Sequence, residues 1–165
     1  MPTASPILLR FARRSEVDRI AEVVNAAYEA EAPFVGRPRT SVEALRAQWR
    51  AGDFIVAESE RGRIVGCVFV TEERPVGRFS LLAVAPEEQG HGIGRELVRA
   101  AEARLRRLAC EEARILVLDR RTELIAWYHR LGYRECGRRP YPYPERMLVP
   151  CEFVEMRRQL SGEEP

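Results

Sequence analysis

The chain has 165 residues, 45% of them hydrophobic and 32% charged, with a formal net charge of +2. This size and composition predict one domain, spanning residues 1–165, with an ordinary hydrophobic core. Arginine and acidic residues are interspersed along the chain, which argues against nucleic acid as a partner. No apolar segment is long enough to cross a bilayer, so we expect no membrane partner and a cytoplasmic location.

Composition also restricts the chemistry that the chain can perform. Four cysteines, Cys67, Cys110, Cys136 and Cys151, show no Cys-x-x-Cys spacing, and only two histidines accompany them. We therefore expect no metal site and reduced thiols. The chain contains arginine but no lysine, which excludes Schiff-base chemistry on a lysine.

Two helices and an irregular loop are predicted near the start of the chain. Apolar residues at helical spacing predict a helix over 15–30, with a buried stripe that includes Ile20. Thr40 and Glu43 are spaced as in a capping box and predict the start of a second, shorter helix. The irregular stretch 31–39 between them is a candidate substrate loop.

Strands are predicted where β-branched and aromatic residues run between turn residues. The predicted strand over 113–118 is apolar enough to be buried on both faces. The predicted ranges are 7–13, 54–58, 64–71, 79–85, 113–118, 133–137 and 151–157. Two further helices are predicted over 93–108 and 122–131, the second ended by Gly132 in a left-handed cap.

The strand over 79–85 runs through Pro86 into a glycine-spaced loop and then directly into a helix. Gly90, Gly92 and Gly94 lack Cβ atoms, so the backbone can approach a ligand closely there. The free N–H groups of the first helical turn point outward at the same place and attract negative charge. The sequence therefore predicts an anion site of the kind that binds a pyrophosphate.

The stretch from Gln89 to Gly94 does not match two well-known glycine-rich motifs that bind phosphates. A dinucleotide fingerprint, Gly-x-Gly-x-x-Gly, would need its third glycine where the chain has Arg95 or Leu97. A P-loop needs a lysine after its last glycine, and the chain has none. The loop must belong to a different class of phosphate site.

Two ordered motifs carry a family resemblance. The first is Gln-x-x-Gly-x-Gly after Leu-x-Val-x-Pro, from Leu82 to Gly94, and the second runs from Ala126 through Tyr128 and Gly132 to the following aromatic residue. Together they resemble the GNAT superfamily of N-acyltransferases, in particular its small single-domain bacterial members. The resemblance implies a mixed α/β GNAT fold: a mostly antiparallel sheet of about six or seven strands with about four helices, splayed between the fourth and fifth strands.

The resemblance implies acetyl-coenzyme A (acetyl-CoA) as the cosubstrate. The backbone of the strand before the loop would pair with the pantetheine arm, and an N–H near Leu82 would stabilise the developing oxyanion. The loop and the first helical turn would hold the pyrophosphate, with side-chain contacts from Gln89 and Arg95. The implied cofactor-binding residues are Leu82, Ala83, Val84, Gln89, Gly90, His91, Gly92, Ile93, Gly94 and Arg95.

Tyr128 lies where the family's general acid often stands, and a phenol with a reference pKa of about 10 can donate a proton to the departing thiolate. The alternative is that Tyr128 only packs its ring against the cofactor. One departure from the family pattern is Arg121, which stands where an Asn often contacts the cofactor. Arg120 or Arg121 could instead meet the adenosine-side phosphate, but we expect both to be surface residues and carry over no Asn contact.

The general base stays open at this point. Several carboxylates could accept the amine's proton, directly or through water. They are Glu29, Glu31, Glu72, Glu73 and Glu123.

The acceptor would be chosen by the loops near the first two helices and the last two strands. Phe34, Arg37 and Arg39 on one side and Tyr141 on the other, with neighbouring Tyr143 and Arg146, could frame a pocket. Arginines there favour an acceptor that carries a carboxylate or a phosphate, such as an amino acid.

The motifs thus predict an N-acetyltransferase that transfers acetyl from acetyl-CoA to a primary amine of a small molecule, by direct attack in a ternary complex. Two alternatives stay open: a non-catalytic acyl-CoA-binding sensor, and an N-acetyltransferase for proteins or peptides. Family members often dimerise, so a homodimer is also an expectation.

Overall fold

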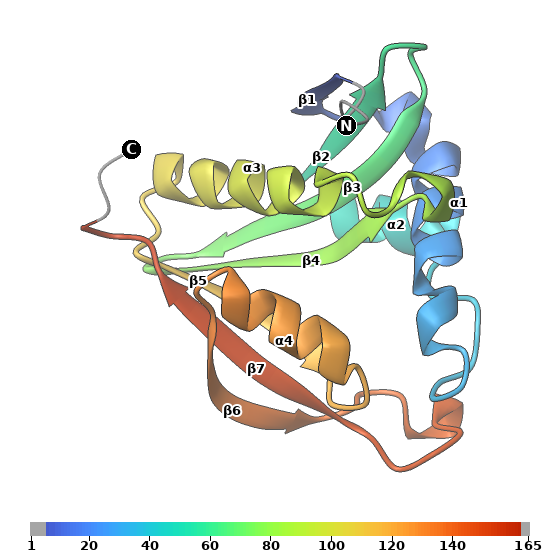
Figure 1. Ribbon diagram of the computed structural model, residues 1–165, viewed down its shortest axis with the longest axis vertical. Helices are drawn as coiled ribbons and strands as arrows, with labels where there is room; N and C mark the ends of the chain where they lie inside the picture. Colours follow the sequence, from blue (N-terminus) through green and yellow to red (C-terminus); the bar gives the residue numbers. More distant parts are fainter. Residues whose placement is uncertain (1–5, 163–165) are drawn as a thin grey trace.

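The computed structural model describes residues 6–162, which form a twisted seven-stranded sheet with four α-helices packed on it (Figure 1). The strands are β1 (Ile7–Phe11), β2 (Asp53–Ser59), β3 (Ile64–Glu73), β4 (Val76–Val84), β5 (Glu112–Leu118), β6 (Arg134–Pro140) and β7 (Glu152–Gln159). The helices are α1 (Val17–Ala27), α2 (Val42–Trp49), α3 (Ile93–Arg107) and α4 (Thr122–Arg130).

The strands lie in the order β1-β2-β3-β4-β5-β7-β6. All neighbours are antiparallel except β4 and β5, which are parallel because helix α3 crosses between them. The predicted mixed α/β architecture, with a mostly antiparallel sheet and this order of helices and strands, is confirmed.

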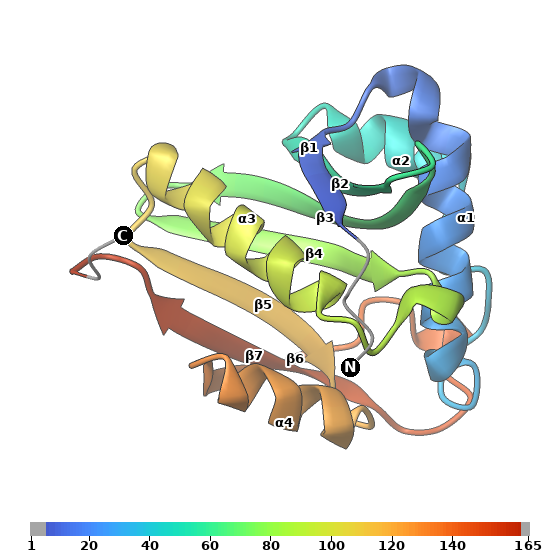
Figure 2. The same ribbon diagram turned by 45° about the horizontal axis from the view of Figure 1, so that its top comes forward.

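Helices cover both faces of the sheet and create two cores (Figure 2). Helices α1 and α2 pack on one face of β2, β3 and β4, where Ile20, Leu45 and Phe54 are buried. Helices α3 and α4 pack on the opposite face, around Leu97 and Tyr133. The helical spacing of the apolar residues around Ile20 thus predicted correctly which side of α1 faces the sheet.

Strands β4 and β5 are paired at one end only. Their register runs from Val76, paired with Glu112, to Arg78, paired with Arg114, and the strands then diverge (Figure 2). The predicted splay between the fourth and fifth strands is confirmed. Leu116 on β5 is consequently 38% exposed, so the expectation that this strand is buried on both faces is wrong.

A β-bulge interrupts β4 beyond the paired end. Two residues of β4, Leu81 and Leu82, lie opposite the single residue Val68 of β3. Leu81 has a φ of 53°, which is rare for a branched side chain, and its side chain is buried in the core under α1. A bulge bends a strand and increases its twist, and this one follows the point where β4 leaves β5.

The start of α2 differs from the predicted cap. The side chain of Ser41, not Thr40, accepts the capping hydrogen bond, from the Ala44 N–H at 3.1 Å. Thr40 is held elsewhere, because its N–H donates to Asn25 Oδ1 (3.0 Å) and its carbonyl accepts from Asn25 Nδ2 (3.1 Å). The Asn25 side chain of α1 thereby anchors the end of the 31–39 loop.

Gly132 ends α4 with a φ of 97°, as predicted. Within residues 6–162, no helix has both the length and the apolar character needed to cross a membrane. The same residues contain no cluster of three or more His, Cys, Asp or Glu side chains suited to a metal ion. All four cysteines are free thiols: Cys67 and Cys110 are buried, and Cys136 is exposed.

Candidate active site

The divergence of β4 and β5 opens a cavity of about 890 Å³. Its lining comes from parts of the chain that are far apart in sequence: strands β4 and β5, the loop before α3, helix α4 and the segments 31–39 and 141–146. The cavity thereby brings together three predicted features, namely the open strand, the glycine loop and Tyr128.

Leu82, Ala83 and Val84 form the β4 wall of the cavity. Ala83 and Val84 pair with β3 on one side. On the other side, the register with β5 has already ended at Arg78. This edge of β4 has no strand partner among the described residues, so its backbone groups other than the Val84 carbonyl, which accepts from the Gln89 side chain, are available to a ligand.

The glycine loop and the start of α3 form a second wall. Gly90 and Gly92 have φ values of 84° and 82°, and a Cβ at either position would meet no atom within 4 Å. Gly92 is the N-cap residue of α3, and the first helical hydrogen bond runs from the Glu96 N–H to the Gly92 carbonyl (3.1 Å). The N–H groups before Glu96 are therefore unsatisfied by the helix, as an anion site requires.

The side chains around this loop differ in whether they face the cavity and in what they contact. Arg95 lines the cavity and has no ion pair with a carboxylate among residues 6–162. Gln89 lines it too, but its Nε2 donates to the Val84 carbonyl (3.0 Å) and ties the loop to β4. His91 instead faces a separate, smaller hollow, with Nδ1 3.1 Å from the Glu88 carbonyl. Ile93 also lines the cavity, but it is only 6% exposed and packs in the core under α3.

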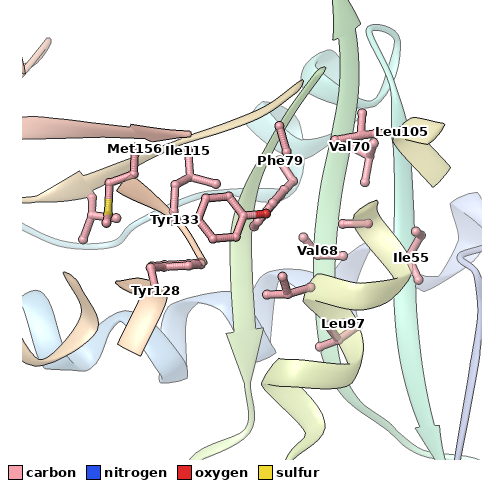
Figure 3. Close-up of a cluster of buried hydrophobic side chains, with 14 of the residues drawn as sticks. Ile55, Val68, Val70, Phe79, Leu97, Leu105, Ile115, Tyr128, Tyr133 and Met156 are labelled. Atoms are coloured by element: carbon pink, nitrogen blue, oxygen red, sulfur yellow. The ribbon is translucent and has the colours of Figure 1, made fainter. Parts of the chain in front are cut away.

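Tyr128 projects from α4 into the core between α3 and β5 and reaches the cavity (Figure 3). Its ring packs against Trp127 at 4.9 Å, Tyr133 at 5.5 Å and Phe79 at 6.4 Å between centroids. Burial raises the pKa of Tyr128 well above the ordinary value for a phenol. The hydroxyl therefore stays protonated at neutral pH and is available as a donor.

Tyr133 differs from Tyr128, although the two rings touch. It is fully buried, and its hydroxyl donates to Glu102 Oε2 at 2.7 Å, next to Arg158. Tyr133 does not line the cavity. Tyr133 is therefore a residue of the core.

Of the six residues that the sequence suggested around the acceptor, Arg39, Tyr141, Tyr143 and Arg146 line the cavity, and Phe34 and Arg37 do not. Arg37 turns back onto α1, where it donates to the Asn25 carbonyl (2.9 Å) and pairs with Glu29 (2.5 Å). The prediction that Phe34 and Arg37 line the cavity is therefore wrong, because the 31–39 loop folds over the end of α1.

Arg121 is a cavity residue that sequence reasoning placed on the surface. Its side chain is only 16% exposed and pairs with Glu31 (3.3 Å) and Glu123 (2.5 Å). The prediction was wrong because Glu31 is 90 positions away in sequence. The one available signal was that Arg121 occupies the family's Asn position.

Glu31 is the only one of the five candidate bases that lines the cavity, within the part of the chain described. Burial raises the pKa of its carboxyl, and the adjacent Arg121 opposes that rise. Neighbouring Tyr28 also lines the cavity, and burial raises its pKa to about 12. A carboxylate with a raised pKa is a better proton acceptor than an exposed one.

Comparison with known proteins agrees with this geometry. The acetyltransferase (GNAT) domain family matches residues 50–135. A mycothiol acetyltransferase from Saccharomonospora viridis is 33% identical over 101 residues, which are 55% of this chain and 33% of that protein. The chain therefore spans about a third of that relative's length. An uncharacterised N-acetyltransferase from Chlorobaculum tepidum is 32% identical over an alignment of 174 positions, which covers 97% of this chain and all of that protein.

The fold is also found among solved structures. The protein yncA from Salmonella typhimurium, solved with its cofactor acetyl-CoA, superposes with a TM-score of 0.74 at 20% identity, and 98% of each chain is covered. Identity at this level shows a common fold. Together with the family match over half of the sequence and the relative covered along its whole length, it shows that the chain belongs to the GNAT family of acetyltransferases.

Proposed function

We propose that residues 1–165 form one acetyl-CoA-dependent N-acetyltransferase domain that acts on a primary amine of a small molecule. The observation that carries the proposal is the single cavity that joins the unpaired edge of β4, the N-terminus of α3 and the hydroxyl-bearing ring of Tyr128. Membership of the GNAT family supports the reaction class, and the yncA complex supports the choice of acetyl-CoA.

The residues of this chain fit acetyl-CoA. Open space where Cβ atoms would stand at Gly90 and Gly92 makes room for phosphates against the backbone. The N–H groups at the start of α3 and the Arg95 guanidinium would bind their charge. Leu82, Ala83 and Val84 would pair with the pantetheine amides. Bound in this way, acetyl-CoA supplies an acyl group that is activated as a thioester.

Groups of the chain would assist the attack of the amine and the departure of the thiol. The amine nitrogen forms a bond to the thioester carbon, and the carbonyl oxygen takes up negative charge, which a β4 N–H near Leu82 would stabilise. The carbon–sulfur bond breaks, and the leaving sulfur takes the proton of the Tyr128 hydroxyl. The nitrogen loses a proton, which water or a carboxylate carries back to the Tyr128 oxygen, leaving an N-acetyl amide, coenzyme A thiol and the hydroxyl restored.

The matched variants Tyr128→Phe and Tyr133→Phe test this assignment, because each removes one hydroxyl from adjoining rings. Tyr128→Phe should lower kcat by about 100-fold while changing the acetyl-CoA dissociation constant by less than about two-fold. Tyr133→Phe should keep kcat and lower the thermal midpoint, since Glu102 loses a buried hydrogen bond. Thiol release measures turnover, and calorimetry measures binding.

Three results would contradict the proposed reaction, and a fourth would contradict only the role of Tyr128. Absence of acetyl-CoA binding would remove the whole assignment. Binding without thiol release for any amine would favour an acyl-CoA sensor, and release only with peptides would favour a protein acetyltransferase. An unchanged kcat in Tyr128→Phe would leave the enzyme in place and reduce Tyr128 to a packing role. The expected homodimer and cytoplasmic location stay predictions.

A further inference from the structure

Two loops that are distant in sequence form one rim of the cavity. Val35 and Met147 form an isolated antiparallel bridge. On either side of it, the Gly36 N–H donates to the Arg146 carbonyl (2.7 Å), and the Leu148 N–H donates to the Phe34 carbonyl (2.9 Å). Backbone hydrogen bonds therefore fix the segments 34–36 and 146–148 relative to each other.

Arg39 extends from the first of these loops into the cavity. Its guanidinium lies over the ring of Tyr28, 5.2 Å from the centroid. The next residue, Thr40, is held at both its N–H and its carbonyl by Asn25. Arg39 is thus presented from an anchored backbone with its planar group supported by an aromatic face.

Arg146 reaches the same rim from the second loop. Its Nη2 donates to the Pro38 carbonyl, directly before Arg39, and the guanidinium lies 5.9 Å from the Tyr143 ring centroid. Both arginines act electrostatically on the Tyr141 phenol, where each opposes the rise in pKa that burial causes. Two cationic groups therefore converge on one side of the cavity.

These two arginines differ from most arginines of the cavity wall because they form no ion pair with a carboxylate of the described residues. Apart from Arg95 beside the glycine loop, the other arginines that line the cavity are ion-paired: Arg78 and Arg114 with Glu155, and Arg121 with Glu31. Neither Arg39 nor Arg146 has a carboxylate partner among residues 6–162. Glu31 lies in the same cavity and acts electrostatically on Arg39, but its ion pair is with Arg121. Two half-buried guanidinium groups that face one cavity with no ion pair of their own form a binding site for an anion.

We infer that the acceptor is a small amine that also carries an anionic group, a carboxylate or a phosphate, which Arg39 and Arg146 bind. The inference rests on the proposed function, because it names the acceptor of that reaction. The planar guanidinium suits two-point binding to either anion. A polycationic amine would meet two like charges at the same rim and bind poorly.

The experiment compares acceptors that differ in the anionic group alone. Amino acids are paired with their carboxamides, and phosphoethanolamine with ethanolamine, with spermidine as the cationic member. The variant Arg39→Gln is matched by Arg37→Gln, which alters an arginine of the same loop that faces α1. Thiol release gives kcat and KM for each pair, and the carboxylate and phosphate arms distinguish the two anions.

We expect wild type to prefer at least one anionic acceptor over its neutral partner. Arg39→Gln should reduce that preference by about ten-fold, because KM for the anionic acceptor rises more than KM for its neutral partner, and Arg37→Gln should leave the preference unchanged. Comparing variants on the same acceptor pair removes the intrinsic difference in amine reactivity. On the wild-type chain, the deaminated acid should inhibit competitively against the acceptor, and its amide should not.

The inference is overturned if spermidine or the neutral members are the better substrates, or if Arg39→Gln keeps the wild-type preference. In both cases thiol release continues, so the proposed function survives. If no amine releases thiol, the proposed function itself fails. Should Arg39→Gln fail to fold, lack of inhibition of wild type by the deaminated acids overturns the inference.

Discussion

Arg10 connects strand β1 to the turn that precedes α1 and to the neighbouring strand. Its Nη1 and Nη2 donate to the two oxygens of Glu16 at 2.8 and 2.6 Å, and its Nε donates to Glu58 at 2.6 Å. Glu16 also accepts the Arg13 N–H at 2.7 Å. The three charged side chains are 17–24% exposed. This two-point geometry is the strongest that a carboxylate and an arginine form.

The cluster predicts an acid-sensitive contribution to stability. Hydrogen bonding to Arg10 lowers the pKa of Glu16 from 4.5 to about 2. A carboxyl with a lowered pKa in the folded state stabilises the fold above its unfolded pKa, and the contribution is lost as the pH falls through the folded value. Glu16→Gln should therefore cost about 1–2 kcal/mol at neutral pH, a value reduced for solvent screening, and less at low pH.

Urea unfolding at pH 7 and at pH 2.5 measures this difference. The control is Glu22→Gln, since Glu22 is 67% exposed and pairs only with Arg19 (3.1 Å) on the surface of α1. That variant should stay within about 0.5 kcal/mol of wild type at both pH values. An equal cost of Glu16→Gln at both pH values would show that the ion pair with Arg10 is not its source.

Local motifs predicted individual site residues well where the chemistry lies in one segment. Gly90, Gly92 and Tyr128 stand at the cavity because a strand, a turn and a helix place them there regardless of the rest of the chain. Arg121 and Arg37 were misplaced for the opposite reason. Their positions depend on Glu31 and on the end of α1, and no spacing rule reports a contact between loops.

The packing of α3 against the sheet depends on a glycine in β3. A Cβ at Gly66 would lie 2.9 Å from Leu97 Cδ1 and 3.0 Å from the Ala83 carbonyl oxygen. Leu97 is fully buried and the carbonyl belongs to the β4 backbone, so neither group can yield freely. Gly66→Ala should destabilise the protein by about 1–3 kcal/mol, as measured by urea unfolding.

Gly137→Ala in β6 is the matched control. A Cβ there would meet no atom within 4 Å, and Gly137, like Gly66, lies in a strand without a positive φ. Its unfolding free energy should differ from wild type by less than about 0.5 kcal/mol. Similar losses in both variants would mean that crowding under α3 is not the cause.

Whole elements were more predictable than their irregularities. The helical period of α1 and α3 and the β-branched runs of the central strands appear directly in the sequence, and all were predicted in the correct order. The bulge at Leu81 was not, because it arises from pairing two residues with Val68 across strands. The cap of α2 also shifted, since Asn25 on another helix binds Thr40.

The sheet as a whole consists of two parts that share one short seam. Strands β1 to β4 form the first part and β5, β7 and β6 the second, and the two are paired only between Val76 and Arg78 on β4 and the facing residues of β5. The cavity lies beyond this seam and is lined from both parts. A ligand bound there would add contacts across the gap that the backbone leaves unpaired.

Acetyl-CoA should therefore stabilise the molecule and order this gap. At about 100 times its dissociation constant, a ligand specific to the folded state adds about 2.7 kcal/mol. For a chain of this size that corresponds to a rise of about 5–10 °C in the thermal midpoint. Hydrogen exchange should slow most at residues 82–84 and 93–95, where unpaired backbone N–H groups would gain partners.

The β1–β2 pair provides an internal reference for this measurement. It is antiparallel from Ile7, opposite Ser59, to Phe11, opposite Ile55, and contributes no residue to the cavity. Its exchange should follow only the global gain in stability, whereas the cavity segments should gain further protection. Equal protection in both regions would mean that the ligand binds without occupying the gap, which would exclude the β4 edge as the pantetheine site.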